Sequence, residues 1–408
     1  MGIAATDHYT IISADTHAGA NHATYREFLD PQYLDDFDAW RNKYKNPFRD
    51  LRDTSLRIRN WDDERRMGDE EADGVVGEVI FPNTVPPFFP TFVLFAGPPK
   101  EEDYEHRLAG IRAHNRWLVD FCERFPERRA GIGQIFLNDV DDAIDDVKWI
   151  KEHGLRGGIL LPNIPPDAKW VKPLYHPDYD RLWEVCEDLE VPVNAHGGTG
   201  SPSYERLPVS GLVHIAEVPF YSQRPFVYLL LGGVFERFPK LEFVMTEMGC
   251  AWIPAMLEWL DGIIKNVRDN GAIGELRFTE DQILARSATE YFQQSCWVGA
   301  SQPGPADVAA RAVMGDNRFM WGSDYPHDEG TYPFTRESLR ALFHDTAPGE
   351  VADLLGGNAA KLYGFDIDAL APIAARVGPT VAEISRPLDE LPAEPNAALL
   401  KTVTGVAL

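Results

Sequence analysis

The stretch Tyr9-Thr10-Ile11-Ile12-Ser13-Ala14-Asp15-Thr16-His17 sets a pattern that recurs along the chain. A short apolar run rich in β-branched residues gives way at once to polar side chains. Such residues favour strands, and a strand that is buried on both faces is apolar throughout rather than alternating. On this pattern we predict eight strands, over residues 9–14, 75–81, 131–137, 158–161, 191–195, 241–246, 291–294 and 319–323.

Helical periodicity lies between most of these runs. We predict helices over residues 106–125, 139–153, 175–189, 252–267, 306–314 and 335–344. Strands that alternate with helices indicate parallel βαβ units, and eight of them favour an α/β fold of the distorted (β/α)8 TIM-barrel type. An open doubly wound sheet is the competing architecture. As a nucleotide-binding fold it would need a glycine-rich turn after the first strand, where Asp15-Thr16-His17 stands instead.

Three stretches exceed a minimal barrel, and we interpret them as loop insertions within a barrel domain of residues 1–365. They span residues 20–74, 84–104 and 197–224. Long loops on the catalytic face of a barrel usually shape or cover the substrate pocket. Residues 366–408 are rich in proline and alanine, and we expect a C-terminal arm that packs on the barrel or on a second subunit.

The composition limits the classes of partner. The chain has 408 residues with 39 Lys+Arg against 64 Asp+Glu, a net charge of −25, which disfavours nucleic acid. The longest apolar stretch, residues 225–235, is too short to span a bilayer, and the first residues lack the pattern of a signal peptide. Four cysteines lie far apart without a CxxC pair, which indicates reduced thiols. We expect a cytoplasmic protein that acts on a small molecule.

Polar residues follow nearly every predicted strand. In a parallel barrel the carboxyl ends of the strands form one face, so these side chains are expected to converge on a catalytic ring. Two histidines and three carboxylates are among them. The ring comprises Asp15 with His17, then Asn83, Asn138, Asn163, His196, Glu247, Ser295 and Asp324.

Four of these residues make a plausible metal site. Asp15 and His17 are two residues apart at a strand end, so their side chains point to the same side, and His196 and Asp324 complete a set of two nitrogens and two oxygens. Such a set suits Zn²⁺, and also Mn²⁺ or Fe²⁺. We expect one ion, because a binuclear site needs further ligands such as a carbamylated lysine, and no lysine stands near Asn163.

Three residues are candidates for proton transfer or substrate contact. Asp324 could bind the metal and also shuttle the proton of an activated water. Glu247 could act as a general base if its pKa is raised, or form an ion pair with a barrel arginine. His327, which follows a proline turn, could reach the substrate or lie exposed on a loop.

These residues stand in motifs that resemble the amidohydrolase-related proteins, in the branch of the aminocarboxymuconate-semialdehyde decarboxylase-like enzymes. The similarity covers residues 8–365. Its motifs are Asp15-Thr16-His17, His196-Gly197-Gly198, the segment 238–249 that reads Phe-Pro-Lys-Leu-Glu-Phe-Val-Met-Thr-Glu-Met-Gly, Gly-Ser-Asp-Tyr-Pro-His at 322–327, and Asn-Ala-Ala-Lys-Leu-Tyr-Gly at 358–364.

The resemblance implies a distorted TIM barrel with one divalent metal, often Zn²⁺ and sometimes Mn²⁺, and commonly a homodimer. By position, His17, His196 and Asp324 match family ligands. Asp15 stands where many members have histidine and some have an acidic residue. Glu247 stands where the decarboxylases typically carry the histidine of a His-x-Gly-Gly motif.

Two kinds of reaction follow from that resemblance. We expect a hydrolase that uses metal-activated water on an amide, ester or lactone bond in a small aromatic or apolar substrate. The alternative is a non-oxidative decarboxylase of an aromatic or unsaturated carboxylic acid. The second is disfavoured by the replaced histidine and by the lack of an evident cation to orient the leaving carboxylate. A non-catalytic metal-binding scaffold is the remaining alternative.

Overall fold

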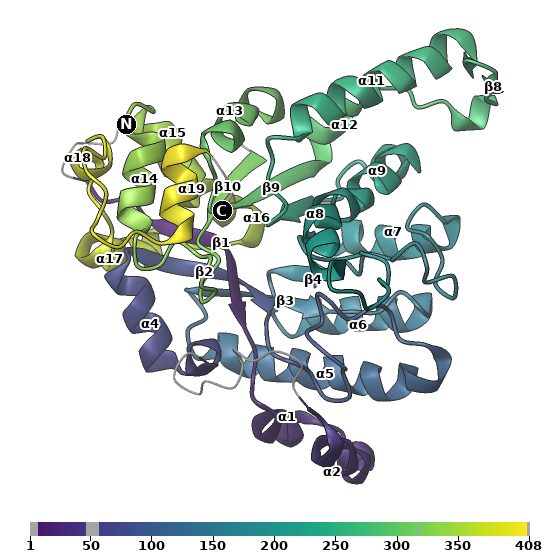
Figure 1. Cartoon of the computed structure of the whole chain (residues 1–408), viewed down its shortest axis with the longest axis horizontal. Helices are drawn as coiled ribbons and strands as arrows, with labels where there is room; N and C mark the ends of the chain where they lie inside the picture. Colours follow the sequence, from purple (N-terminus) through teal and green to yellow (C-terminus); the bar gives the residue numbers. More distant parts are fainter. Residues whose placement is uncertain (1–6, 46–56, 316–317, 406–408) are drawn as a thin grey trace.

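The computed structural model describes residues 7–45, 57–315 and 318–405. Eight parallel strands form one sheet in the order of the chain (Figure 1). They are β1 (Ile11–Ala18), β2 (Val75–Pro82), β3 (Arg129–Gln134), β4 (Gly158–Leu160), β5 (Val193–His196), β6 (Phe243–Thr246), β9 (Cys296–Ser301) and β10 (Phe319–Gly322).

The last strand returns beside the first, and hydrogen bonds join them. The backbone N–H of Asp324 donates to the carbonyl oxygen of Asp15 over 2.9 Å, and that of His17 donates to the carbonyl oxygen of Tyr325 over 2.7 Å. Below them, the Ser323 N–H donates to the Ser13 hydroxyl at 2.8 Å. The (β/α)8 barrel is confirmed, and the open doubly wound sheet is wrong.

Helices connect the strands and cover the barrel. All six predicted helices are present with slightly different ends. Asp139 caps one of them, because its side chain accepts hydrogen bonds from the N–H groups of Asp141 and Asp142. The helices are α5 (Glu101–Glu123), α6 (Val140–Glu152), α7 (Asp180–Asp188) after the turn η4 (Pro177–Tyr179), α9 (Arg224–Leu231), α10 (Val234–Arg237), α11 (Ile253–Asn270), α12 (Ala288–Ser295), α13 (Pro305–Met314) and α14 (Thr335–Phe343).

The prediction for the seventh strand is wrong. Residues 291–294 lie inside helix α12, and the seventh strand of the barrel is β9, Cys296–Ser301. The helix begins with a capping box, in which Ser287 accepts from the Glu290 N–H and the Glu290 carboxylate accepts from Ser287. Ser295 therefore ends a helix, and the polar residue at the end of the strand is Ser301.

Two of the three predicted insertions contain short helices. The described residues of the stretch 20–74 form α1 (His22–Phe28), α2 (Leu34–Lys43) and α4 (Asp63–Ala72), with the turns η1 (Pro31–Tyr33) and η3 (Ile58–Asn60), and residues 46–56 lie outside the described residues. Residues 84–100 form turns without a helix or strand. Residues 197–224 contain α8 (Ser210–Ser222). After α11 comes a small hairpin of β7 (Ala272–Ile273) and β8 (Leu276–Arg277), then the turn η5 (Glu280–Gln282); Figure 1 shows α11 extending away from the barrel toward β8.

The end of the chain packs on the barrel. Its helices are α15 (Pro348–Ala352), η7 (Asp353–Gly357), α16 (Asn358–Tyr363), α17 (Ile367–Val377), α18 (Val381–Ile384) and α19 (Ala397–Thr404). The Tyr9 N–H donates to the carbonyl oxygen of Pro379 over 2.9 Å, and Arg336 of α14 pairs with Glu383 of α18 at 3.0 Å. The described end of the chain therefore lies against α14 and the start of β1 (Figure 1).

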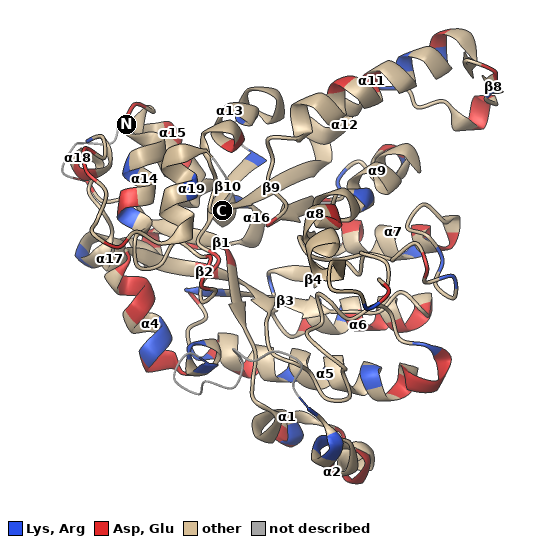
Figure 2. Ribbon diagram, viewed as in Figure 1, with Lys and Arg blue, Asp and Glu red and all other residues tan. Residues whose placement is uncertain are grey.

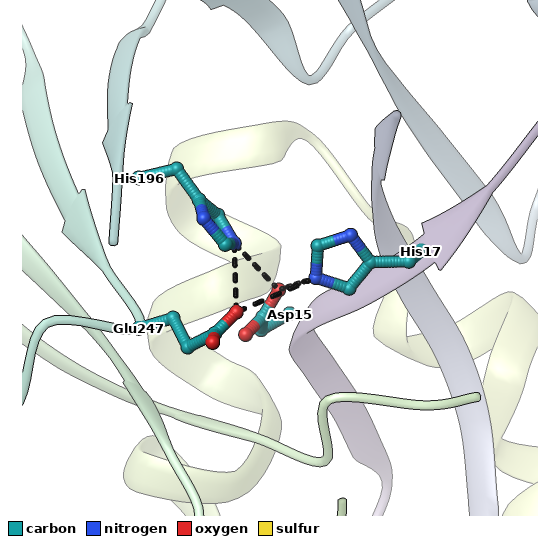
Figure 3. A group of neighbouring side chains, drawn as sticks. All are labelled: Asp15, His17, His196 and Glu247. Carbon is teal, nitrogen blue, oxygen red and sulfur yellow. Dashed lines mark ion pairs between the residues drawn. The ribbon is translucent and has the colours of Figure 1, made fainter. Parts of the chain in front are cut away.

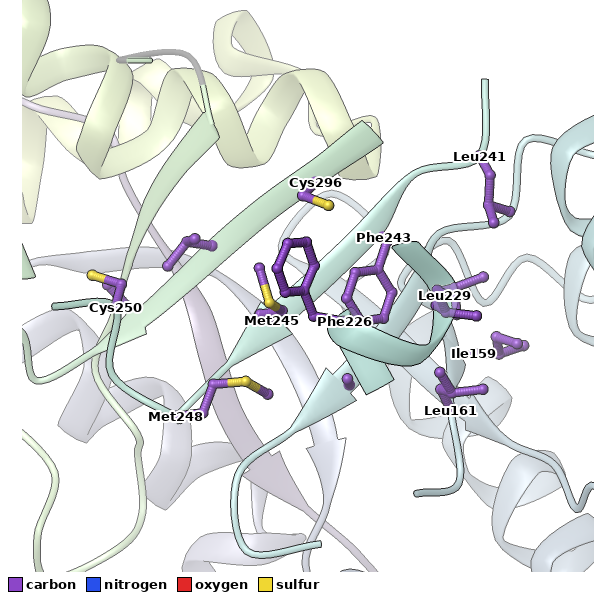
Figure 4. Close-up of a cluster of buried hydrophobic side chains, with 14 of the residues drawn as sticks. Ile159, Leu161, Phe226, Leu229, Leu241, Phe243, Met245, Met248, Cys250 and Cys296 are labelled. Carbon is purple, nitrogen blue, oxygen red and sulfur yellow. The ribbon is translucent and has the colours of Figure 1, made fainter. Parts of the chain in front are cut away.

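Two hydrophobic cores hold the barrel. The inner core joins apolar side chains of the strands, such as Ile12, Val244 and Met320, to Tyr363 and Phe365, which follow the last strand. The outer core lies between strands and helices; Figure 4 shows the part where Phe226 and Leu229 of α9 meet Phe243 and Met245 of β6. All four cysteines are free and buried, as expected.

Charge is distributed over the outside of the barrel. Figure 2 shows acidic residues along α4 and on α5 and α6. Among the described residues, no helix is both long and apolar enough to cross a membrane.

A buried network of charges supports the strand that carries Asp15 and His17. Glu78 of β2 is fully buried; its carboxylate accepts from Arg66 Nε (2.9 Å), Arg129 Nε (3.1 Å) and the Thr16 hydroxyl (2.9 Å). Arg66 also donates to the carbonyl oxygen of His17 over 2.8 Å. Four elements, α4 and β1 to β3, are thus tied together directly beneath His17.

We predict that Glu78→Gln destabilises the protein by about 3–5 kcal/mol, because it leaves two buried guanidinium groups without their shared anion. The free energy of unfolding can be measured by urea denaturation. Asp269→Asn is the matched control: Asp269 pairs with Lys265 on the exposed surface of α11, where solvent screens the pair and the loss should be much smaller. Equal losses for the two variants would contradict a supporting role for Glu78.

Candidate metal centre

The first strand brings two potential ligands to the centre of the barrel. Asp15 and His17 are fully buried in β1, and the pairing of β1 with β2 shifts register between Ser13 and Thr16. The last residue of β10, Gly322, lies so close that a Cβ added to it would be 2.7 Å from Asp15 Cβ. A glycine at this position therefore lets β10 close the barrel against the strand that carries the two ligands.

Four side chains from three strands meet there, as Figure 3 shows. His17 Nε2 lies 3.4 Å from Asp15 Oδ1 and 3.6 Å from Glu247 Oε2. His196 Nε2, at the end of β5, lies 3.6 Å from Asp15 Oδ1 and 3.1 Å from Glu247 Oε2. These four atoms all lie within 4.8 Å of one another.

None of the four facing atoms has a hydrogen-bond partner in the described chain. The other ring nitrogens face backbone oxygens: His196 Nδ1 lies 2.9 Å from the carbonyl of Gly197, and His17 Nδ1 lies 3.4 Å from that of Pro82. A carbonyl only accepts, so each Nδ1 carries a proton and each Nε2 directs its lone pair inward when the ring is neutral. Buried, unpartnered oxygen and nitrogen donors of this kind fit a divalent cation.

The charges of the cluster lead to the same conclusion. Burial lowers the pKa of the His196 imidazole, but the carboxylates of Glu247 and Asp15 outweigh it and raise that pKa to about 10. The pKa of His17 is also raised, against the effect of burial, by Asp15, Asp324 and Glu247. Both imidazoles are thus driven to hold protons that offset the carboxylates. A divalent cation would supply the same positive charge.

Asp324, just after β10, lies beside this cluster. Its Oδ1 is 3.4 Å from His17 Nε2 and 2.7 Å from His327 Nδ1, and its Oδ2 accepts a hydrogen bond from Gln302. A second set of mutually close ligand atoms therefore comprises His17, Glu247, Asp324 and His327.

The contacts of His327 favour its protonated form. Its Nε2 lies 3.1 Å from Asn83 Oδ1, and Asn83 uses its own N–H group toward Asn60, so the Asn83 oxygen accepts. With acceptors on both sides, Asp324 and Asn83, both ring nitrogens donate. Burial lowers the pKa of His327, but the charge of Asp324 outweighs it and raises that pKa.

Two of the carboxylates sit on strained backbone. Glu247 has a φ of 52° and Asp324 a φ of 61°, in the left-handed region that favours glycine. Strain of this kind costs about 1–3 kcal/mol per residue and is concentrated at functional sites. The two differ in exposure: 28% of the Glu247 side chain is accessible, whereas Asp324 is fully buried. Glu247 is therefore the most exposed carboxylate of the cluster, although its Oε2 faces both imidazoles. These imidazoles lower the pKa of Glu247 to about 2 against the effect of burial, so the raised pKa expected of a general base is wrong, and its ion-pair partners are histidines rather than an arginine.

The predicted ring is only partly assembled. The structure brings together Asp15, His17, His196, Glu247, Asp324 and His327, with Asn83 in contact with His327. Asn138 instead donates to the carbonyl of Pro99, and Asn163 to those of Thr199 and Tyr221.

Sequence reasoning missed Ser301 and Gln302. The Ser301 hydroxyl donates to Asp15 Oδ2, and Gln302 donates to Asp324 Oδ2. Both follow the apolar run Cys296–Ala300, which is the signal that would have found them. Assigning the seventh strand to residues 291–294 hid that signal.

A cavity of about 530 Å³ lies over the ends of β3, β4 and β5. Its walls include Phe95, Phe136 and Leu161, and the segment that follows His196 forms one side through Gly198 to Ser203. The cavity thus shares the end of β5 with the cluster. A mainly apolar substrate could extend from the ligand atoms into it.

The chain is similar to proteins of known sequence and structure. A family model described as amidohydrolase matches residues 15–365. A 2-amino-3-carboxymuconate-6-semialdehyde decarboxylase of Dictyostelium discoideum is 22% identical over 319 residues, which cover 75% of this chain and 77% of that protein.

Solved structures share the fold at lower identity. A 5-carboxyvanillate decarboxylase of Novosphingobium aromaticivorans, complexed with manganese and a nitrobenzoic acid, has a TM-score of 0.64 and 18% identity, covering 89% of this chain and 98% of that one. A 2,6-dihydroxybenzoate decarboxylase of Rhizobium has a TM-score of 0.61 and 16% identity, covering 88% and 99%. The match of the family model to most of the chain shows that this protein belongs to the amidohydrolase family.

Proposed function

We propose that this protein is a divalent-metal-dependent, non-oxidative decarboxylase of an aromatic or unsaturated carboxylic acid. The observation that carries the proposal is His327, held between Asp324 and Asn83 beside the atoms of Asp15, His17, His196 and Glu247 that have no hydrogen-bond partner in the described chain. Decarboxylation needs a positive group that orients the leaving carboxylate, and the sequence had offered none. His327 meets that need.

The relatives support decarboxylation over the hydrolysis that we expected from the sequence. The curated relative and the two solved structures described above carry the names of decarboxylases. The glutamate in place of the sixth-strand histidine had argued for hydrolysis. Because Glu247 Oε2 faces both imidazoles while 28% of the side chain is accessible, Glu247 can relay a proton between water and the site, as that histidine would.

The residues take distinct roles in this proposal. Asp15, His17, His196 and Asp324 hold one divalent ion, which when bound attracts the oxygens of the substrate and balances the carboxylates. His327, kept protonated by Asp324 and Asn83, faces the substrate carboxylate. The bond from this carboxylate to the substrate carbon breaks, carbon dioxide leaves, and the electron pair stays on the carbon. Because the imidazoles of His196 and His17 lower the pKa of Glu247 to about 2 against the effect of burial, its carboxylate holds no proton of its own, and it would relay a proton from a water molecule to that carbon.

Manganese is the ion that we now favour, whereas the sequence had suggested zinc. Three carboxylates accompany two imidazoles at the site, and oxygen-rich sets suit Mn²⁺ as well as Zn²⁺.

We predict about one metal ion per chain in protein purified without added metal, as measured by elemental mass spectrometry. The double variant His17→Ala/His196→Ala should lose it, and the exposed His153→Ala should retain it. A metal-free wild type, even after reconstitution with Mn²⁺ and Zn²⁺, would contradict the site.

We predict that hydroxylated benzoates release carbon dioxide with the Mn²⁺-loaded enzyme, whereas the amides, esters and lactones of the same ring acids are not hydrolysed. Product formation can be followed by chromatography in parallel reactions. Asp324→Asn is the control for background reaction, because it removes both a proposed ligand and the partner of His327. Hydrolysis without decarboxylation would restore the hydrolase hypothesis. If neither reaction occurs while the metal is bound, the non-catalytic scaffold would be favoured.

We predict that Glu247→Gln lowers kcat about 100-fold or more, with a small change in KM and no loss of metal, because the amide cannot transfer the proton. Steady-state kinetics and elemental analysis of the same preparation separate the two effects. Loss of metal from this variant would make Glu247 a ligand rather than the proton carrier.

Three further expectations remain proposals. A homodimer is supported by apolar side chains exposed on α8, where Leu212, Ile215 and Phe220 each keep 68–70% of their surface accessible. A cytoplasmic location is supported by the four free thiols. The division into a barrel over residues 1–365 and an arm over residues 366–408 is supported by α18 and α19, which pack on α14, whereas Leu370 and Ala374 of α17 join the inner core.

A further inference from the structure

The cavity beside the cluster contains polar atoms that the protein itself leaves unpaired. Gln134 lies at the end of β3 and is 1% exposed, yet neither its Nε2 nor its Oε1 has a hydrogen-bond partner in the described chain. The same holds for Thr91 Oγ1, Asn163 Oδ1 and Ser201 Oγ. All four residues line the cavity. Buried polar atoms are nearly always hydrogen-bonded, so five unpaired atoms around one cavity indicate a ligand that pairs with them.

The backbone of Gln134 is held in place while its side chain is free. Asn115 of α5 donates to the carbonyl of Gln134 over 2.9 Å and accepts from its N–H over 2.8 Å. The side-chain amide of Asn115 thus satisfies both backbone groups at the end of β3. The backbone of Gln134 is thus fixed, while its side-chain Nε2 remains an unused donor group and its Oε1 an unused acceptor.

Asn163 is fixed in a similar way on the neighbouring strand end. Its Nδ2 donates to the carbonyls of Thr199 and Tyr221, so its Oδ1 alone is unused. Gly200, with a φ of 79°, permits this packing, because a Cβ there would lie 2.2 Å from Asn163 Nδ2. The cavity therefore has a rigid polar side formed by two amides.

The charge of the cavity wall selects against an anion. Asp167 is the one acidic residue of the lining, and the described lining contains neither lysine nor arginine. A second carboxylate or a phosphate on the substrate would meet no lysine or arginine there, and only the imidazole of His214 as a basic group. A neutral group is what unpaired amide and hydroxyl groups recognise.

The cavity wall is connected to the cluster through residues around His196. The Thr199 hydroxyl, in the cavity wall, donates to the carbonyl of His196 over 2.8 Å. Phe81 packs on His196 with ring centroids 4.6 Å apart, and it belongs to the same apolar cluster as Leu160, which lines the cavity. A ligand whose carboxylate lies at the metal ligands can therefore place its far end in the cavity.

We propose that Gln134 is a specificity-determining residue, which pairs with a neutral group that both donates and accepts a hydrogen bond at the end of the substrate remote from its carboxylate. A carboxamide has this chemistry, because its N–H meets Gln134 Oε1 while its carbonyl meets Gln134 Nε2. The assignment of this group to the substrate rests on the proposed decarboxylase function. The binding properties of the cavity do not, and they are tested without turnover.

The probes are benzamide and acetophenone, which have the same shape and differ in the amide N–H₂ group. Dissociation constants are measured by ligand-observed NMR on the full-length, metal-loaded protein. The wild type should bind benzamide about tenfold more tightly than acetophenone. Gln134→Met, which keeps the length of the side chain, should remove that preference. Gln32→Met, on the exposed turn η1, is the matched control and should keep it.

A second variant tests the same contact through a gain of binding. Gln134→Glu should bind benzamidinium about tenfold more tightly than the wild type does, because a carboxylate pairs with an amidinium through two hydrogen bonds. Gln32→Glu should show no gain. Thermal denaturation checks that each variant is folded, and either variant suffices if the other fails to fold.

The outcomes separate the two proposals. A lost benzamide preference in Gln134→Met, or a gain for benzamidinium in Gln134→Glu, supports the subsite even if no carboxylic acid is decarboxylated, in which case the proposed function alone fails. An equal affinity of the wild type for benzamide and acetophenone, or a preference that Gln134→Met retains, overturns the role of Gln134 whatever the enzyme catalyses.

Discussion

Unbalanced negative charge at the centre of the barrel is the constraint on which the site depends. The carboxylates of Asp15, Glu247 and Asp324 share one small space with the imidazoles of His17 and His196. In a medium of low dielectric constant these carboxylates require positive charge nearby, as protons on the imidazoles or as a metal ion. The closure of β10 against β1 at Gly322 keeps the groups this close. Without it, they could separate and be solvated individually.

The contrast with Glu78 shows why this charge is functional rather than structural. Glu78 is as deeply buried as Asp15, but Arg66, Arg129 and Thr16 satisfy its oxygens. The neighbouring Glu70 lies 3.4 Å from Arg66 Nε and has no hydrogen bond among the described residues, but burial and Glu78 raise its pKa well above the ordinary value, which favours a neutral carboxyl group there. In the cluster above it, four ligand atoms face one another without a hydrogen-bond partner in the described chain. The arginines of this region thus pair with the supporting carboxylate, Glu78. The positive charge that the upper cluster needs must come from outside the chain.

The parts that the sequence predicts are those that depend on local pattern. Apolar runs followed by polar residues located seven of the eight strands, and the spacing of two between Asp15 and His17 indicated that they share a side. The seventh strand could not be separated from α12, because Tyr291 and Phe292 suit a buried strand as well as a buried helix face. The charge of His327 was also hidden, since it arises from Asp324 and Asn83, and Asn83 is far from it in the sequence. Likewise, an unpaired Gln134 is recognised only when every possible partner has been placed.

The groups proposed for metal binding and proton transfer stand on different strands from most of the cavity. This separation determines how such a barrel can change its substrate specificity. The proposed ligands and proton-transfer groups stand on β1, β5, β6 and β10 or just after them, whereas the cavity lies over β3, β4 and β5. Only the end of β5 belongs to both. Substitutions at Gln134 or Asn163 can therefore alter what is recognised without moving a group that holds the metal or carries a proton. Substitutions at Gly197 to Thr199 cannot, because the same backbone positions His196 and forms the cavity wall. Chemistry and recognition are thus separable in this fold everywhere except along the segment that follows the fifth strand.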